Sequence, residues 1–327
     1  MLGIDLGHYS LKYCLSQRRR ENRFEVLRVG ELVLPGEILA EGEMKSKNLL
    51  IENVRLFFQR HRLPKEVALA FYHPRMVIHH VHLPDMPEGE LENALRWEAS
   101  SIITGEDNLQ VGWYPLRKDE HGLEILFSAT PTVAVQEWVE AFFQAGIRIE
   151  AIEPQALSLA RALLSFYQEL QRIPFILIDI GFQKSAIVYF NEGHLKFARY
   201  FSWGLHKIWN LLEEKFSLST IDIMEMMKRG NEGNNLPYQL EEGVREGGQD
   251  LAVELRRSLA FLQTEFKADV EGERCFVIGG GACLVPLRRL VAQNISPHCE
   301  GSKPFVLGRE SIPSERFLSA LGASLWS

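Results

Sequence analysis

The sequence predicts an α/β protein of two related lobes that face a shared cleft. Three glycine turns carry this prediction, each following an apolar strand: Asp5-Leu6-Gly7, Asp179-Ile180-Gly181 and Gly279-Gly280-Gly281. The first two open the two halves of the chain with the same order of strand, Asp-x-Gly turn and strand. A single Asp-x-Gly is most often an ordinary turn, so the prediction depends on the repetition and on the third element.

The same turns predict a site for a metal-bound phosphate. Gly7 and Gly181 can take backbone angles closed to other residues, so the chain can reverse sharply and present N–H groups to an anion. Asp5 and Asp179 would stand at strand ends, where they could hold magnesium directly or through water. A carboxylate without a metal would only repel phosphate, so the pair predicts a Mg-nucleotide. The bare turn at 279–281 would let a base or ribose lie against backbone.

Length and composition predict a globular protein with large buried cores, because the chain has 327 residues and 46% apolar content. The 36 Lys and Arg against 43 Asp and Glu give a net charge of -7, and the basic run at 18–20 is short, so no nucleic-acid partner is expected. The four cysteines lack Cys-x-x-Cys spacing, which is typical of reduced cytosolic thiols. No apolar run approaches the ~18 residues of a bilayer span. We therefore expect a cytoplasmic protein that reaches a membrane through a partner.

We expect the first lobe at residues 1–74, continued at 147–172. Hydrophobic periodicity predicts strands at 11–15, 24–29, 67–71 and 147–152, and helices at 49–58 and 154–170.

Residues 75–146 are expected to form an inserted α+β subdomain. Its predicted elements are a strand at 76–83, a helix that begins just after Asp85 and continues through Ile102, strands at 109–116 and 123–129, and a helix at 133–145. Asp85 with Glu88 suggests a capped helix start, with Pro87 in the first turn. Of the histidines in the first strand, only His80 and His82 share a face. A metal site there would therefore need further ligands from other parts of the chain.

The second lobe is expected at 173–312, and a helix at 313–327 returns to the first lobe. The pattern predicts strands from 175 and at 195–201, then helices after Gly204 and at 251–262. Residues 230–250 are rich in Gly, Asn, Glu and Gln, which predicts a mobile loop. The final helix is predicted to be amphipathic.

Together these features resemble the actin/Hsp70-type ATPase superfamily. Within its FtsA/PilM branch, the chain is similar, essentially from end to end, to the PilM family of type IV pilus assembly proteins. The matching segments are LENALRWEASSII at 91–103, ELRRSLAFL at 254–262, VIGGGACLVP at 277–286 and SALGASLW at 319–326. Arg96-Trp97-Glu98 discriminates best, because it lies in the insertion that separates this branch from actin and sugar kinases.

The resemblance implies ATP or ADP with Mg²⁺ between the lobes. Asp5 and Asp179 would be catalytic and would hold magnesium through water. The other implied nucleotide-binding positions are Gly7, Ser10, Lys12, Gly181, Lys184, Gly204, Lys228, Glu254, Arg257, Gly279, Gly280 and Gly281. The family usually has small hydroxyl residues after both Asp-x-Gly turns, whereas this chain has His8-Tyr9 and Phe182-Gln183-Lys184. We therefore expect nucleotide binding with weak or absent hydrolysis.

The resemblance also implies a partner, the cytoplasmic N-terminal tail of an inner-membrane PilN-like protein. We expect this tail to bind the insertion, adding a strand to its sheet edge, at Ile78, His80, Leu91, Leu95 and Trp97. The stripe of Leu91 and Leu95 is more typical of a core than of a partner contact, and Trp97 at its edge is the better contact candidate. Pilus motor ATPases and a second copy of the chain are further expected partners. Two alternatives remain open, a cytoplasmic subunit of a type II secretion system and an actin-fold small-molecule kinase.

Overall fold

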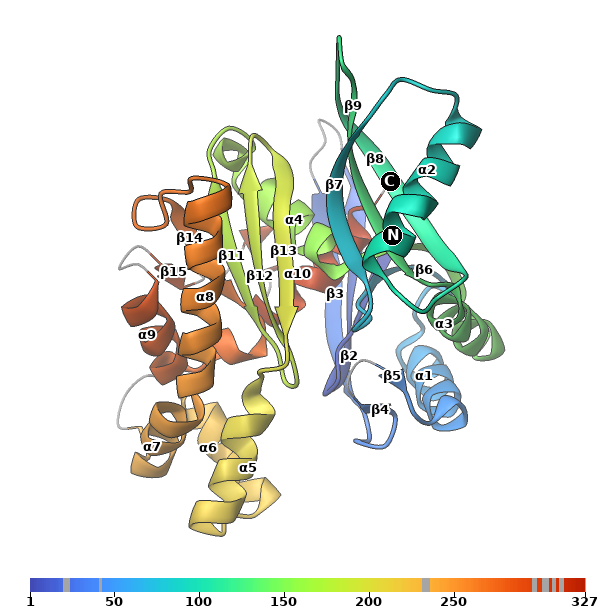
Figure 1. The fold of residues 1–327 in the computed structure, drawn as a ribbon. Coiled ribbons are helices and arrows are strands. Elements are labelled where there is room, and N and C mark those ends of the chain that lie inside the picture. Colours follow the sequence, from blue (N-terminus) through green and yellow to red (C-terminus); the bar gives the residue numbers. More distant parts are fainter. Residues whose placement is uncertain are drawn as a thin grey trace.

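Two five-stranded sheets, one in each lobe, form the body of the molecule, and a three-stranded sheet stands beside them (Figure 1). The structure is a computed structural model that describes residues 1–19, 24–40, 43–230, 236–295, 299–301, 306–307, 310–311 and 315–326. The predicted two-lobed α/β class is confirmed. Among the described residues, no helix is long and apolar enough to cross a membrane.

The first-lobe sheet has the order β10-β6-β1-β2-β3. Apolar faces of α1 and α3 cover it, with Phe57 and Trp138 packed near Leu2 and Ile4 in one core. The elements are β1 (Leu2–Leu6), β2 (Ser10–Arg18), β3 (Phe24–Val33), β4 (Leu39–Ala40), β5 (Glu43–Met44), α1 (Lys47–His61), β6 (Glu66–Phe71), α3 (Thr132–Gln144) and β10 (Arg148–Pro154).

The second-lobe sheet repeats this topology in the order β13-β12-β11-β14-β15. In each lobe the central strand, β1 or β11, pairs antiparallel with the next strand and parallel with a later one. The strands are β11 (Phe175–Ile180), β12 (Ser185–Asn191), β13 (His194–Phe201), β14 (Arg274–Ile278) and β15 (Cys299–Gly301), and the helices are α5 (Leu205–Phe216), α6 (Thr220–Gly230), α7 (Tyr238–Gly247), α8 (Gln249–Glu265) and α9 (Val285–Asn294). The small strands β16 (Val306–Leu307) and β17 (Glu310–Ser311) pair with each other.

Two helices, α4 (Gln155–Phe166) and α10 (Leu318–Ser324), fill the space between the two large sheets. Residues 318–324 are all buried, so the prediction of an amphipathic last helix is wrong. The helix is apolar or small on every side because α4 covers one face and β1, β2 and β6 cover the other. The start of the predicted segment, Pro313, lies outside the described residues.

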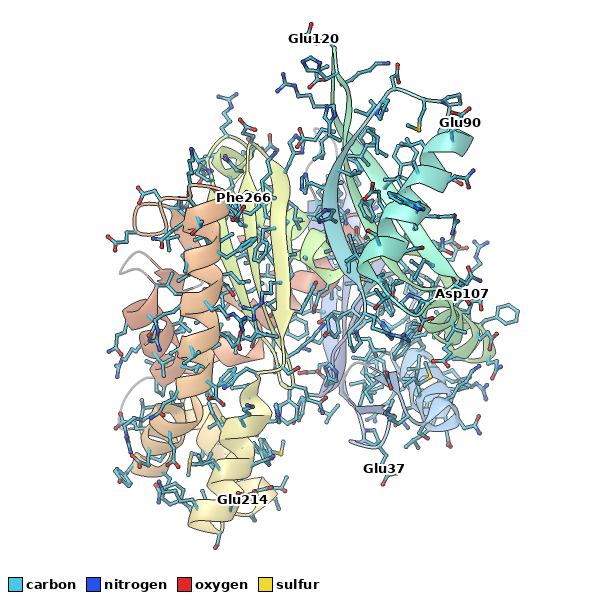
Figure 2. The ribbon with its side chains drawn as sticks, in the orientation of Figure 1. Glu37, Glu90, Asp107, Glu120, Glu214 and Phe266 are labelled. Atoms are coloured by element: carbon cyan, nitrogen blue, oxygen red, sulfur yellow. The ribbon has the colours of Figure 1, made fainter. Side chains whose placement is uncertain are left out.

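The insertion is a sheet of order β7-β9-β8 with α2 on one face. Its elements are β7 (Val77–Leu83), α2 (Glu88–Ile102), β8 (Leu109–Asp119) and β9 (Gly122–Pro131). Glu90 and Glu120 mark its outer end, far from Glu214 on α5 (Figure 2). The predicted cap by Asp85 is not formed, since Pro87 occupies the N-cap and Asp85 pairs with Lys118 at 2.6 Å.

The expected loop at 230–250 is wrong over much of its length, because α7 occupies 238–247 and α8 begins at Gln249. Leu240 and Val244 are buried, and Gly243 and Gly247 lie against Ile208 of α5. These glycines therefore allow close helix packing and do not mark a loop. Residues 231–235 of the expected loop lie outside the described residues.

Replacing Gly322 by alanine should lower stability by at least about 2 kcal/mol, because the new Cβ would collide with the Ser158 carbonyl of α4. Chemical denaturation of wild type and variant measures this difference. Gly89→Ala is the matched control: that helical position has nothing within 4 Å, so its stability should be unchanged or slightly higher. Equal stability of Gly322→Ala and wild type would contradict the close packing of α10 on α4.

Candidate functional site

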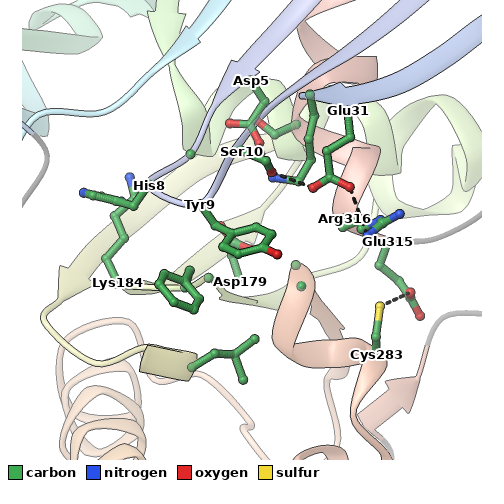
Figure 3. A pocket seen from close by; sticks show the side chains of 18 of the residues that line it. Asp5, His8, Tyr9, Ser10, Glu31, Asp179, Lys184, Cys283, Glu315 and Arg316 are labelled. Atoms are coloured by element: carbon green, nitrogen blue, oxygen red, sulfur yellow. Dashed lines mark hydrogen bonds and ion pairs between the residues drawn. The ribbon is translucent and has the colours of Figure 1, made fainter. Parts of the chain in front are cut away.

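A cavity of about 370 Å³ lies between the lobes, at the point where the two Asp-x-Gly turns face each other. Asp5, with the turn after β1, lines one side, and Asp179, with the turn after β11, lines the other (Figure 3). The third glycine turn, after β14, and side chains of α5 and α6 complete the lining. The three glycine elements that are distant in the sequence thus meet at one cavity.

The two Asp-x-Gly turns have the same closed geometry. The Gly7 N–H donates to the Ser10 carbonyl and the Gly181 N–H donates to the Lys184 carbonyl, each at 3.0 Å. These two N–H groups are therefore already used within their turns. The expectation of unusual backbone angles is also wrong for both glycines, since of the glycines in the three turns it is Gly279 that has a positive φ, 86°.

The aspartates are buried at the cavity floor, Asp5 with 6% and Asp179 with 8% exposure. Asp5 Oδ1 accepts a hydrogen bond from Gln155 Nε2 at 3.1 Å, and Asp5 Oδ2 lies 3.9 Å from Lys12 Nζ. Asp179 Oδ1 packs so closely on Gly279 that a Cβ there would collide with it. Among the residues described, no group of three His, Cys, Asp or Glu side chains is placed to hold a metal ion.

Lys184 places a cation between the two lobes. Its Nζ lies 2.9 Å from the ring centroid of Tyr72, which follows β6, and 4.8 Å from that of Tyr200 on β13. Burial lowers the pKa of Lys184 well below its usual value, and Asp179 and Asp5 oppose this shift. Burial first, and then Asp5, raise the pKa of Asp179 to about 6.

Aromatic side chains follow both turns and meet across the cavity. The Tyr9 and Phe182 ring centroids lie 5.1 Å apart, and Phe182 lies 6.1 Å from Trp209 of α5. His8 is largely buried, and its Nε2 has no hydrogen-bond partner. Burial, followed by Lys184 and His206, lowers the pKa of His8 to about 4.

A polar chain on the first-lobe side was not predicted from the sequence. Ser10 Oγ donates to Glu31 at 2.6 Å, and Glu31 pairs with Arg316 at 3.1 Å (Figure 3). Further lining residues that the sequence analysis missed are Gln155, Leu205, Trp209, Met224 and Met227. Met224, Met227 and Lys228 of α6 have the spacing of one helix face, which is the available signal in the sequence.

The structure brings most of the predicted nucleotide residues to this cavity: Asp5, Gly7, Ser10, Lys12, Asp179, Gly181, Lys184, Lys228, Gly279 and Gly280. Gly204 and Gly281 are not in the lining; a Cβ at either would collide with Phe182 or Ile180, so both permit close packing behind it. Glu254 and Arg257 also lie outside the lining, on α8, where Glu254 pairs with Arg199 at 2.6 Å.

The predicted partner residues separate into buried and accessible ones. Leu91 and Leu95 lie on the inner face of α2 and are 3% and 0% exposed. They therefore belong to the insertion core and are not available to a partner. Trp97 is 71% exposed. Ile78 and His80 face the lobes, and His80 Nε2 is hydrogen-bonded to the carbonyl of Leu195 on β13.

A second cavity, of about 710 Å³, lies between the insertion, α4 and the β12–β13 turn. Tyr114, Leu116 and Leu126 of the insertion sheet line one side. Leu157 and Leu164 of α4 line another. Within the described residues β8 pairs with β9 alone, so its other edge has no strand partner there. The cavity thus has an apolar lining that includes side chains of this edge strand.

Comparisons with known proteins identify the family of this chain and solved structures with a similar fold. A family model described as type IV pilus assembly protein PilM matches residues 3–313. The chain is similar to the solved "PilM-PilN type IV pilus biogenesis complex", with 21% identity, TM-score 0.82, and coverage of 99% of this chain and 97% of that one. No curated protein sequence matches.

Two further structures share the fold at lower identity. The ethanolamine utilization protein EutJ from Carboxydothermus hydrogenoformans has 13% identity and TM-score 0.59, with 100% of this chain and 89% of that one covered. MreB5 of Spiroplasma citri bound to ADP has 11% identity and TM-score 0.53, with 98% and 94% covered. These likenesses confirm the predicted actin-like fold.

Replacing His8 by glutamine should flatten the acid branch of the stability curve. Between pH 6.5 and about 4 the unfolded chain gains a proton that the folded chain does not bind at His8, so wild-type stability falls as pH drops through this window. The effect should be at most about 2 kcal/mol, allowing for partial exposure. Denaturation at pH 7 and pH 4 measures it. His121→Gln, at an exposed hairpin site, is the control, and equal pH dependence of both variants would contradict the burial of His8.

Proposed function

Because this chain belongs to the type IV pilus assembly protein PilM family, we propose that it is a nucleotide-binding scaffold of a type IV pilus assembly machine. It holds ATP or ADP between its lobes and the cytoplasmic tail of an inner-membrane PilN-like protein on its insertion. The observation that carries the nucleotide part is the meeting of all three glycine turns at one cavity between the lobes. The family match favours this function over a secretion subunit or a small-molecule kinase.

The proposed nucleotide lies with its phosphates between the turns after β1 and β11. Lys12 and Lys184 supply positive charge there. The nucleoside lies beside Gly279 and Gly280, where the absent side chain of Gly280 leaves room, with Met227 of α6 against the base. Gln155 Oε1 is buried without a hydrogen-bond partner and lines the same cavity, which gives a bound water or ribose one acceptor.

Magnesium fits these residues only through water. Asp5 is engaged by Gln155 and Lys12, and Asp179 packs on the third glycine turn, so neither carboxylate offers an unhindered direct ligand. A magnesium ion, when bound, would offset phosphate charge. Since Tyr9 and Phe182 stand in place of small hydroxyl residues, we propose that hydrolysis is weak or absent.

The proposed tail site is the second cavity, beside β8. An extended peptide could add a strand to the open edge of β8 and place alternate apolar side chains against Leu116, Leu126 and Leu157. This placement differs from the edge at β7, which contacts β13 through His80. The neighbouring strand β9 adds the Glu124–Lys196 ion pair to β13, at 3.5 Å. Trp97, which the sequence analysis assigned to the tail, is proposed instead to contact another partner, such as a motor ATPase or a second copy. The tail would hold the cytoplasmic chain at the inner membrane.

ATP should raise the melting temperature of nucleotide-free protein by roughly 3–5 °C at a hundred times its dissociation constant, since such binding adds about 2.7 kcal/mol. Gly280→Leu should abolish the shift, because position 280 has nothing within 4 Å and the new side chain would enter the cavity. Gly36→Leu, at another open position, should keep it. A full shift in Gly280→Leu would contradict the proposed nucleoside position.

Leu116→Arg should weaken binding of a synthetic PilN-like tail peptide by about tenfold or more, because a charge replaces an apolar contact of the second cavity. Fluorescence anisotropy with a labelled peptide measures this, after circular dichroism has shown that the variant is folded. Trp97→Ala should bind as wild type. The reverse pattern, with Trp97→Ala impaired and Leu116→Arg intact, would move the tail to α2.

A further inference from the structure

The cavity floor contains a balanced set of charges that a nucleotide must meet. Asp5 and Asp179 are the acidic groups, and Lys12 and Lys184 are the basic ones. Lys12 lies beside Asp5 at 3.9 Å. Lys184 interacts electrostatically with both aspartates, so each carboxylate has a lysine near it. The floor therefore carries its own counterions.

Lys184 has a position that a hydroxyl side chain could not reproduce. It starts from the second-lobe turn, and its amino group crosses to the face of Tyr72 in the first lobe. The Tyr200 ring, which packs against Tyr72, lies 4.8 Å from the same Nζ. Two aromatic faces stabilise a cation at this point. The amino group lines the cavity, between the two turns that would flank the phosphates. Burial alone lowers its pKa, and a phosphate beside it would favour the protonated ammonium.

A cation in this position does what a metal ion does for phosphate charge. In a partly buried cavity the attraction between an ammonium and a phosphate is much stronger than in water. Asp5, which would repel phosphate if unpaired, already has Lys12 and the Gln155 hydrogen bond beside it, so Lys184 is left to meet the phosphates. Arg316 is engaged by Glu31, and Lys228 stands on α6, so Lys184 is the lysine set between the lobes.

We propose that Lys184 takes the charge-neutralising place of magnesium in this chain, so that the cavity binds nucleoside di- and triphosphates without a divalent cation. This inference rests on the proposed nucleotide function and adds the charge requirement of the ligand. It separates this chain from a site in which hydroxyl residues and a metal ion share the phosphates.

The test compares ATP binding in excess MgCl₂ and in excess EDTA, by calorimetry on nucleotide-free protein. Wild type should bind with affinities within about threefold of each other in the two solutions. Lys184→Ser should lose about tenfold or more in EDTA, and magnesium should restore most of that loss. Lys184→Met, which keeps the aliphatic stem against Tyr72, should behave in the same way. Lys228→Met is the control and should weaken binding equally in both solutions.

Two results would overturn the proposed role of Lys184. Wild-type binding that is tenfold weaker in EDTA overturns it, as does a folded Lys184→Ser or Lys184→Met that binds ATP in EDTA as tightly as wild type. These results would leave the nucleotide proposal standing. No ATP binding in either solution would overturn the nucleotide proposal itself, and this inference with it.

Discussion

The close packing of α4 and α10 between the two large sheets is the constraint on which the rest of the structure depends. Gly3 of β1 touches the backbone of α10, and Gly322 of α10 touches the backbone of α4, so a Cβ at either position would collide with main chain. This contact sets the spacing of the lobes. It also fixes the direction in which β1 and β11 end, and hence the meeting of Asp5 with Asp179 at one cavity.

Local signals were sufficient for the repeated parts of the fold. The strand, Asp-x-Gly turn and strand that open each half include short, near-continuous apolar runs and recur with the same pairing in both lobes, so they could be predicted from the sequence. The wrong predictions concern segments whose structure depends on tertiary packing and not on local sequence. Gly243 and Gly247 suggest a loop, yet they serve helix contact with Ile208, and α10 is short and apolar because it is enclosed on both faces.

The candidate site divides in the same way. Residues within the three turns were predictable, because glycine and aspartate at a strand end have a local physical meaning. Glu31, Gln155 and Arg316 were not, since each enters the cavity from a distant element through tertiary placement alone. Leu91 and Leu95 illustrate the opposite failure, in which one apolar stripe fits both a core and a contact surface and burial alone distinguishes them.

The bulky residues after the turns have a structural explanation that follows from the aromatic contacts. From the sequence, Tyr9 and Phe182 stand where the family usually has small hydroxyl residues. In the structure each ring packs against the other across the lobes, and Phe182 also meets Trp209, while a cavity of about 370 Å³ persists beside them. Such ring pairs add about 0.5–1.5 kcal/mol beyond their buried area. Tyr9 and Phe182 therefore supply contacts that hold the two lobes together beside the cavity.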